Sequence, residues 1–198
     1  MQQEMTIKHD NLEVQGIWGQ ATNPIEGAAP LVIFAGVKGE DANDAAEAQY
    51  LNDAGIQTFA FEADSFEAAK KDLPAVFEEL RQKDQVASEY IVLAGFGQGG
   101  RAAALAASRL GKSVSGIFLM APVFMPSDLL ELKKYQGVAY VLAGSLDGEA
   151  PMSNLSLAAK TLPRGELLEI RDAKHAYRLQ DVERAAMLLR TLVMTALN

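Results

Sequence analysis

The chain has 198 residues, of which 49% are hydrophobic and 22% are charged, so it can bury a substantial core and does not have the composition of a disordered chain. Its net charge is −8 and its lysines and arginines do not gather in one stretch, which argues against a nucleic acid as partner. The absence of cysteine and the presence of only two histidines exclude disulfides, iron–sulfur clusters, a cysteine nucleophile and a metal centre built from thiolates or several histidines.

The order of residues gives no sign of a second domain or of a membrane segment. No repeat, low-complexity tract or linker-like stretch lies between residue 30 and the C-terminus, so we expect one domain over residues 1–198. The first five residues lack a basic segment followed by an apolar one, and no uninterrupted apolar stretch reaches about 20 residues. We therefore expect a cytoplasmic protein without a membrane partner.

The predicted strands differ in kind between the start of the chain and the rest. Leu12 to Trp18 alternates apolar and polar residues, which is typical of an antiparallel strand with one covered face. From residue 31 onward the chain carries short, nearly continuous apolar runs, which are typical of strands buried on both faces. These runs are Leu31–Phe34, Ile56–Phe61, Tyr90–Ala94, Val114–Met120, Val138–Ala143 and Leu167–Ile170.

Helix signals fill the segments between these runs. Gly55 and Gly111 stand just past two helix ends, and Asp64-Ser65 begins a helix in which we expect a kink at Pro74. The predicted helices are Asp44–Asp53, residues 64–83, Arg101–Leu110, Ser127–Tyr135, Ser153–Thr161 and Asp181–Leu197. This alternation predicts an α/β fold, a three-layer α/β/α sandwich whose mainly parallel sheet has an antiparallel strand or hairpin at its start.

Three short segments follow predicted strands, where open α/β sheets carry their functional groups. They are residues 95–100 (Gly-Phe-Gly-Gln-Gly-Gly), residues 144–147 (Gly-Ser-Leu-Asp) and residues 172–177 (Asp-Ala-Lys-His-Ala-Tyr). In this order they resemble the α/β-hydrolase superfamily, and within it the dienelactone-hydrolase-like and small esterase branch. The likeness covers residues 30–197 as a pattern of elements. Too few residues separate Pro122 from Val138 for a large lid, so we expect a shallow, open pocket.

The resemblance implies a role for individual residues. The nucleophile position at the sharp turn between strand and helix falls on Gly97, the acid on Asp147 and the histidine on His175, with Tyr177 in an aromatic place two residues later. The backbone amides of Val37 and Gln98 become candidates for an oxyanion hole. Ala35 stands where relatives often have histidine.

Gly97 limits what the resemblance implies, because glycine has no side chain with which to attack a carbonyl carbon. Our leading hypothesis is a pseudoenzyme that binds a small-molecule ligand, or an unidentified protein, without a metal or cofactor. The alternative is an enzyme in which Asp147 and His175 act as a general-base pair on an ester-like substrate without a covalent intermediate. The sequence leaves open whether any catalysis remains.

A second alternative is dinucleotide binding, since Gly95, Gly97 and Gly100 form a G-x-G-x-x-G pattern between a buried strand and an alanine-rich helix. Arg101 would add a positive charge beside a pyrophosphate. However, Val114–Pro122 contains no acidic residue to bind the ribose hydroxyl groups.

Structural explanations compete with the functional ones. Asp147 lies in a Leu-Asp-Gly turn sequence, His175 suits a loop with a satisfied ring, and Gly97 relieves strain wherever a positive φ is needed. Ser65 and Ser145 are weaker substitutes for a nucleophile. We expect a solvated acidic cluster at Glu40, Asp41, Asp44 and Glu47, and core aromatic residues at Trp18, Phe59, Phe61, Phe77, Phe118 and Phe124.

Overall fold

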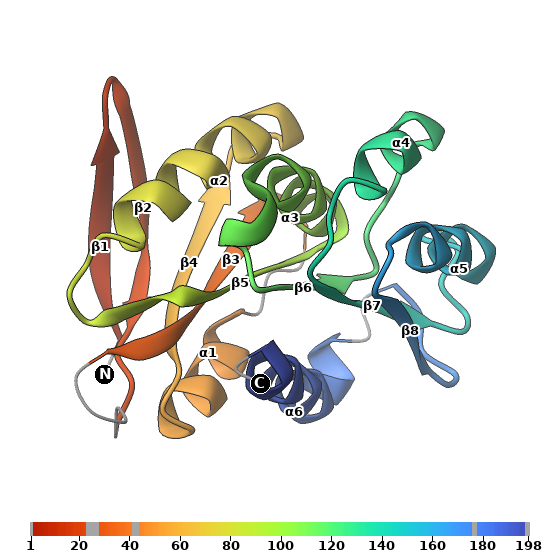
Figure 1. Cartoon of the computed structure of the whole chain (residues 1–198). Helices are drawn as coiled ribbons and strands as arrows, with labels where there is room; N and C mark the ends of the chain where they lie inside the picture. Colours follow the sequence, from red (N-terminus) through yellow and green to blue (C-terminus); the bar gives the residue numbers. More distant parts are fainter. Residues whose placement is uncertain (1, 23–27, 41–43, 176–177, 197–198) are drawn as a thin grey trace.

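One sheet runs through the whole molecule (Figure 1). The computed structural model describes residues 2–22, 28–40, 44–175 and 178–196. Its strands lie in the order β1-β2-β4-β3-β5-β6-β7-β8. They span β1 (Gln2–His9), β2 (Leu12–Gly19), β3 (Ala29–Val37), β4 (Gln57–Ala63), β5 (Val86–Phe96), β6 (Gly116–Met120), β7 (Val138–Gly144) and β8 (Gly165–Ile170).

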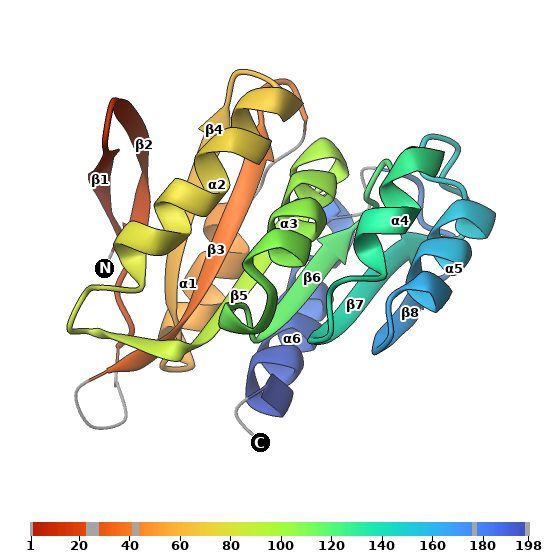
Figure 2. The same ribbon diagram turned by 45° about the horizontal axis from the view of Figure 1, so that its top comes forward.

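The helices cover both faces of this sheet, as Figures 1 and 2 show. Helices α1 and α6 lie on one face, and α2, α3, α4 and α5 lie on the other. Their bounds are α1 (Asp44–Asp53), α2 (Phe66–Leu80), α3 (Gly97–Leu110), α4 (Leu129–Leu132), α5 (Met152–Thr161) and α6 (Arg178–Ala196), with short 3-10 helices η1 (Gly111–Ser113) and η2 (Pro126–Asp128). The predicted three-layer α/β/α architecture is therefore confirmed.

The strand pairing follows the two hydrophobic patterns. Strand β2 pairs antiparallel with β1 and β4, whereas β3 to β8 pair in parallel. On β2 the side chains of Val14 and Trp18 are buried while Glu13 and Gln15 are exposed, as the alternation predicted. Strand β3 contacts β4 on one side and β5 on the other, so the strand order reverses there. Ligands of open α/β folds bind beyond the carboxyl ends at such a reversal.

Three helix predictions need correction. The helix predicted over Ser127–Tyr135 ends at Leu132, because Tyr135 turns into the core, where its hydroxyl donates to the Val114 carbonyl at 3.2 Å. The second helix spans Phe66–Leu80, shorter than the predicted residues 64–83, with Leu73 and Phe77 buried on the apolar face that holds it against the sheet. Pro74 lies inside this helix, and the kink expected there stays a prediction. Helix α3 begins at Gly97, four residues before the predicted start.

The predicted aromatic core is largely present. Trp18, Phe59, Phe61, Phe77 and Phe118 are buried, whereas Phe124 is only partly buried against the core. No helix in the part of the chain that the structure describes is long and apolar enough to span a membrane.

An ion pair joins α3 to the segment before α4. The Arg101 guanidinium donates to both carboxylate oxygens of Asp128, at 2.7 and 3.2 Å, and lies 4.0 Å from the ring centroid of Phe66 on α2. The Asp128 carboxylate also accepts the Met125 amide at 2.7 Å. Both side chains of this pair are largely removed from water. Through the contacts of Arg101 with Phe66 and Asp128, the pair links α2, α3 and the segment that leads into α4.

Removing the guanidinium should destabilise the fold, because the Asp128 side chain is only 7% exposed and would lose its charged partner. We expect Arg101→Ala to lower the free energy of unfolding by about 3 kcal/mol, measured by urea denaturation. Arg109→Ala removes an exposed arginine from the same helix and should change that free energy by less than about 0.5 kcal/mol. Equal losses in the two variants would contradict a stabilising role for the pair.

Candidate functional site

The bend between β5 and α3 is built from closely packed glycines. A Cβ atom on Gly95 would lie 2.5 Å from the backbone of Gly99, and one on Gly100 would lie 2.7 Å from the Gly95 carbonyl oxygen. A Cβ atom on Gly99 would overlap the Ala35 carbonyl on β3. These contacts let the start of α3 lie directly on the sheet, so packing alone accounts for Gly95 and Gly100 of the G-x-G-x-x-G pattern.

Gly97 is the first residue of α3 and has a φ of +52°. That conformation favours glycine over residues with a Cβ atom. The structure therefore has the strand-to-helix bend where the sequence predicted the nucleophile position.

The carboxylate of Glu40 lies over this bend. Its two oxygens accept the backbone N–H of Gln98 at 2.9 Å each, and one accepts the Gly99 N–H at 3.4 Å. A Cβ atom on Gly97 would lie 2.8 Å from Glu40 Oε1, closer than real Cβ contacts allow. A side chain on Gly97 would therefore have to displace the Glu40 carboxylate.

A tight turn after β3 directs Glu40 to this position. The Glu40 amide donates to the Val37 carbonyl at 3.1 Å, and Gly39 between them has a φ of +87°. A positive φ at the third residue is typical of a type II turn and favours glycine there. The local sequence Val-Lys-Gly-Glu thus places the carboxylate beyond the carboxyl end of β3.

Glu40 and Glu47 correct the prediction of a solvated acidic cluster. Glu47 on α1 is fully buried, and Glu40 is half-buried against the start of α3. Asp41 lies outside the described residues, and the side chain of Asp44 is not described. The only sequence signal for Glu40 was its place after a predicted strand, which did not distinguish it from the acidic residues beside it.

Burial raises the pKa of the Glu40 carboxyl above its ordinary value. The N–H groups of Gln98 and Gly99 and the nearby His175 oppose this rise, while the charge of Glu149 adds to it. The net direction follows desolvation, which penalises the ionised form.

The Asp147 and His175 side chains contact each other. His175 Nδ1 lies 2.8 Å from Asp147 Oδ2, and the Asp147 side chain is fully buried. The other carboxylate oxygen of Asp147 accepts the backbone N–H groups of Glu149 and Ala150, at 2.9 and 2.8 Å. With both oxygens bonded, Asp147 holds a fixed orientation, and it fixes that of the imidazole.

Two loops bring this pair together beyond β7 and β8. The Leu146 amide donates to the Ala173 carbonyl at 2.9 Å, and the Ser145 hydroxyl accepts the Asp172 amide at 2.7 Å. The Ser145 side chain therefore joins the loop after β7 to the loop after β8 by a hydrogen bond. Ser65, the other substitute nucleophile considered, caps α2 by accepting the Ala68 amide.

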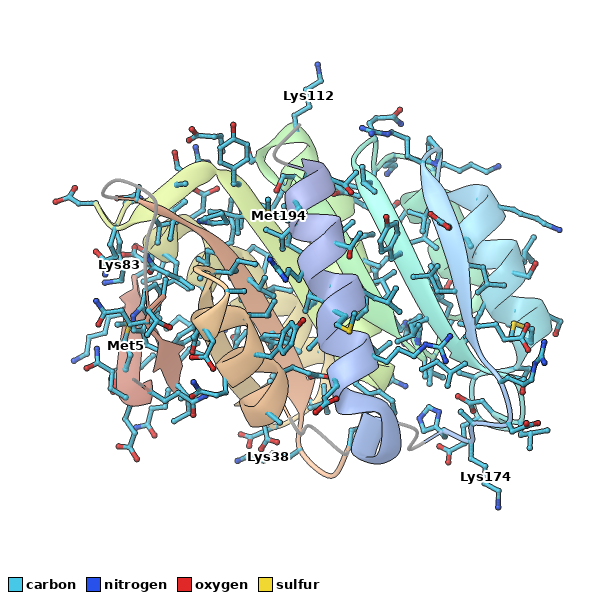
Figure 3. The ribbon with its side chains drawn as sticks, turned by 90° about the horizontal axis from the view of Figure 1, so that it is seen from below. Met5, Lys38, Lys83, Lys112, Lys174 and Met194 are labelled. Carbon is cyan, nitrogen blue, oxygen red and sulfur yellow. The ribbon has the colours of Figure 1, made fainter. Side chains whose placement is uncertain are left out.

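His175 also reaches the bend at Gly97. Its ring packs on Phe96, the last residue of β5, with 4.8 Å between ring centroids. Its Nε2 lies 3.8 Å from Glu149 Oε2. Lys38 and Lys174 lie at the same end of the sheet, seen from below in Figure 3. The site thus combines the ends of β3, β5, β7 and β8.

The structure describes Val37 but not Tyr177, the two other residues singled out from the sequence. Val37 ends β3 and its carbonyl begins the turn to Glu40, which leaves its predicted amide role a prediction. Tyr177 lies outside the described residues. Among the described residues, no group of three or more histidine or acidic side chains is arranged to hold a metal ion.

The raised pKa of Glu40 predicts how stability depends on pH. Because the folded state binds this proton more tightly than the unfolded chain, stability gained from Glu40 is present below its ordinary pKa of 4.5 and is lost as the pH rises through the folded value. Wild type should therefore lose stability relative to Glu40→Gln as the pH rises above 4.5. Denaturant unfolding of both proteins across this range measures the difference, and a gain by wild type would contradict the prediction.

Solved structures with the same fold span nearly the whole chain. Est1E from Butyrivibrio proteoclasticus is 17% identical, with a TM-score of 0.80 over 96% of this chain and 99% of Est1E. Dienelactone hydrolase from Anabaena variabilis is 15% identical, with a TM-score of 0.82 over 98% of this chain and 97% of that enzyme. DcsB, solved in complex with its substrate analogue, is 14% identical, with a TM-score of 0.83 over 99% and 100% of the two chains.

The sequence itself matches the model of the dienelactone hydrolase family over residues 31–186. No curated protein matches it. The matched range includes Glu40, Gly97, Asp147 and His175.

Proposed function

The chain belongs to the dienelactone hydrolase family. We propose that it binds a small, neutral, ester-like molecule and forms no covalent intermediate with it. In this proposal Gly97 stands where hydrolases of the α/β fold carry their nucleophile. The observation that carries it is the hydrogen bond from the Gln98 amide to the Glu40 carboxylate, at 2.9 Å. The attacking side chain is absent, and the amide that would stabilise an oxyanion already has a carboxylate partner.

The carboxylates that bond or lie nearest to His175 favour a neutral ligand over an anion. The carboxylates of Glu40 and Glu149 lie near the ring, and Asp147 bonds it on the other side. A carboxylate ligand entering this site would meet like charges in a partly desolvated setting, where repulsion is stronger than in bulk water. An ester of the same acid avoids that repulsion.

A second candidate function is hydrolysis by general-base catalysis. The contact between His175 and Asp147 at 2.8 Å favours it, because an oriented imidazole can accept a proton from water. General-base catalysis alone contributes about 10²- to 10⁴-fold in rate, so the substrate would need close positioning against the imidazole.

Methyl ferulate separates the two candidates, and its choice follows the ferulic acid complex of Est1E. We expect saturable binding of methyl ferulate in NMR titrations, binding of ferulate at least tenfold weaker at neutral pH, and no turnover above the buffer rate. Turnover that disappears in His175→Ala would favour the general-base enzyme instead. Absence of binding, or equal binding of acid and ester, would contradict the binding proposal.

A fluorophosphonate probe tests the role assigned to Gly97 and Glu40. Wild type should remain unlabelled, and Gly97→Ser alone should react slowly because the Glu40 carboxylate must be displaced by the new side chain and still holds the Gln98 amide. Combining Gly97→Ser with Glu40→Ala frees the space and the Gln98 amide, so we expect labelling at least tenfold faster. Stoichiometric labelling of wild type, or equal rates in the two variants, would contradict these roles.

A further inference from the structure

Strand β1 forms one edge of the sheet, with β2 on its inner side (Figure 2). Its residues Gln2 to His9 pair with Gly19 to Leu12. In the part of the chain that the structure describes, residues 3–8 make no backbone hydrogen bond outside this pairing. An edge of this length can pair with another strand unless its side chains oppose it.

The hairpin geometry shows which backbone groups face outward. Two residues, Asp10 and Asn11, connect β1 to β2, so the flanking residues His9 and Leu12 form a hydrogen-bonded pair. Alternation then directs the N–H and C=O groups of Ile7 and Met5 to β2. Those of Glu4, Thr6 and Lys8 point away from the sheet.

The charges on this edge complement a second copy of the same edge. We propose that the protein forms a symmetric dimer in which β1 pairs antiparallel with β1 of a second copy, centred on Thr6. Each Glu4 then lies opposite Lys8 of the other copy, so the edge supplies two ion pairs. Sliding one β1 strand along the other by two residues would place Glu4 opposite Thr6, and sliding it by four would place Glu4 opposite Glu4 of the second copy. Neither of these registers forms the Glu4–Lys8 ion pairs.

The two faces of the edge are also self-complementary. The face of β1 opposite α2 carries Glu4, Thr6 and Lys8. There Glu4 and Thr6 border a hollow of about 590 Å³ beside the hairpin, and Lys8 is exposed, so these side chains are accessible to a second copy. On the face covered by α2, Met5 of each copy would lie opposite Ile7 of the other. The dimer would therefore contain two apolar Met5–Ile7 pairs. Cross-strand pairs of both kinds stabilise antiparallel sheets.

The opposite edge lacks this complementarity. Within Gly165–Ile170, strand β8 carries the exposed Glu166 and Glu169 and no basic residue, and the exposed Arg164 and Arg171 lie just outside the strand. Two β8 edges paired over these six residues would therefore bring carboxylates together without an opposite charge from within the strand. The dimer is independent of the proposed ligand site, which lies beyond β3, β5, β7 and β8.

Sedimentation velocity tests the dimer directly. Wild type should sediment with twice the 21.3 kDa mass of the chain. Glu4→Lys opposes Lys8 with lysine and should weaken the dimer about tenfold. Adding Lys8→Glu, together with Glu13→Lys to keep the ion pair that Lys8 makes within its own hairpin, exchanges the charges and should restore the dimer. The matched control Glu166→Lys makes the same charge change on the β8 edge and should have no effect.

The backbone and the register are tested separately. Thr6→Pro removes an outward N–H and leaves the β1–β2 pairing intact, so it should give a folded monomer. Thr6→Cys introduces the only thiol in the chain. A short bis-maleimide crosslinker should join its two copies, because Cα atoms of a hydrogen-bonded pair lie about 5.5 Å apart. A monomeric wild type, or a dimer that survives Thr6→Pro, would overturn the proposal.

Discussion

The hydrogen bonds between the Glu40 carboxylate and the first amides of α3 define this site. They hold the Glu40 carboxylate over Gly97, which has no side chain. The close packing of α3 on the sheet requires glycines at 95, 99 and 100, and this packing brings the Gln98 amide within reach of the turn after β3. The fold thus supplies the donors, and the Val37–Glu40 turn supplies the acceptor.

The neighbouring groups are placed by a different part of the fold. Asp147 and His175 come from loops that hydrogen-bond to each other beyond β7 and β8, and the ring of His175 reaches the bend by packing on Phe96. The acid–imidazole contact is therefore maintained without any contribution from residue 97. In our proposal a hydrolase framework keeps its positioning elements while its own carboxylate fills the space of the missing side chain.

Hydrophobic periodicity and glycine placement predicted most of the fold, because buried parallel strands and capped helices leave strong local signals. The order of the three motif segments likewise predicted the contact between Asp147 and His175. Glu40 could not be predicted in this way. Its position depends on a tight turn, on the missing side chain of Gly97 and on the approach of α3 to β3, and these come together only in the folded chain. Helix α4 was predicted too long for a similar reason, since the burial of Tyr135 is a tertiary effect.

The most direct measurement of the central contact is the pH dependence of the Gln98 amide proton by NMR, from about pH 4 to about pH 8. If Glu40 binds this amide, its proton resonance should move downfield as the carboxyl ionises, with a midpoint above 4.5, and the change should be absent in Glu40→Gln. A Gln98 resonance that does not change with pH, or that changes equally in Glu40→Gln, would contradict the account.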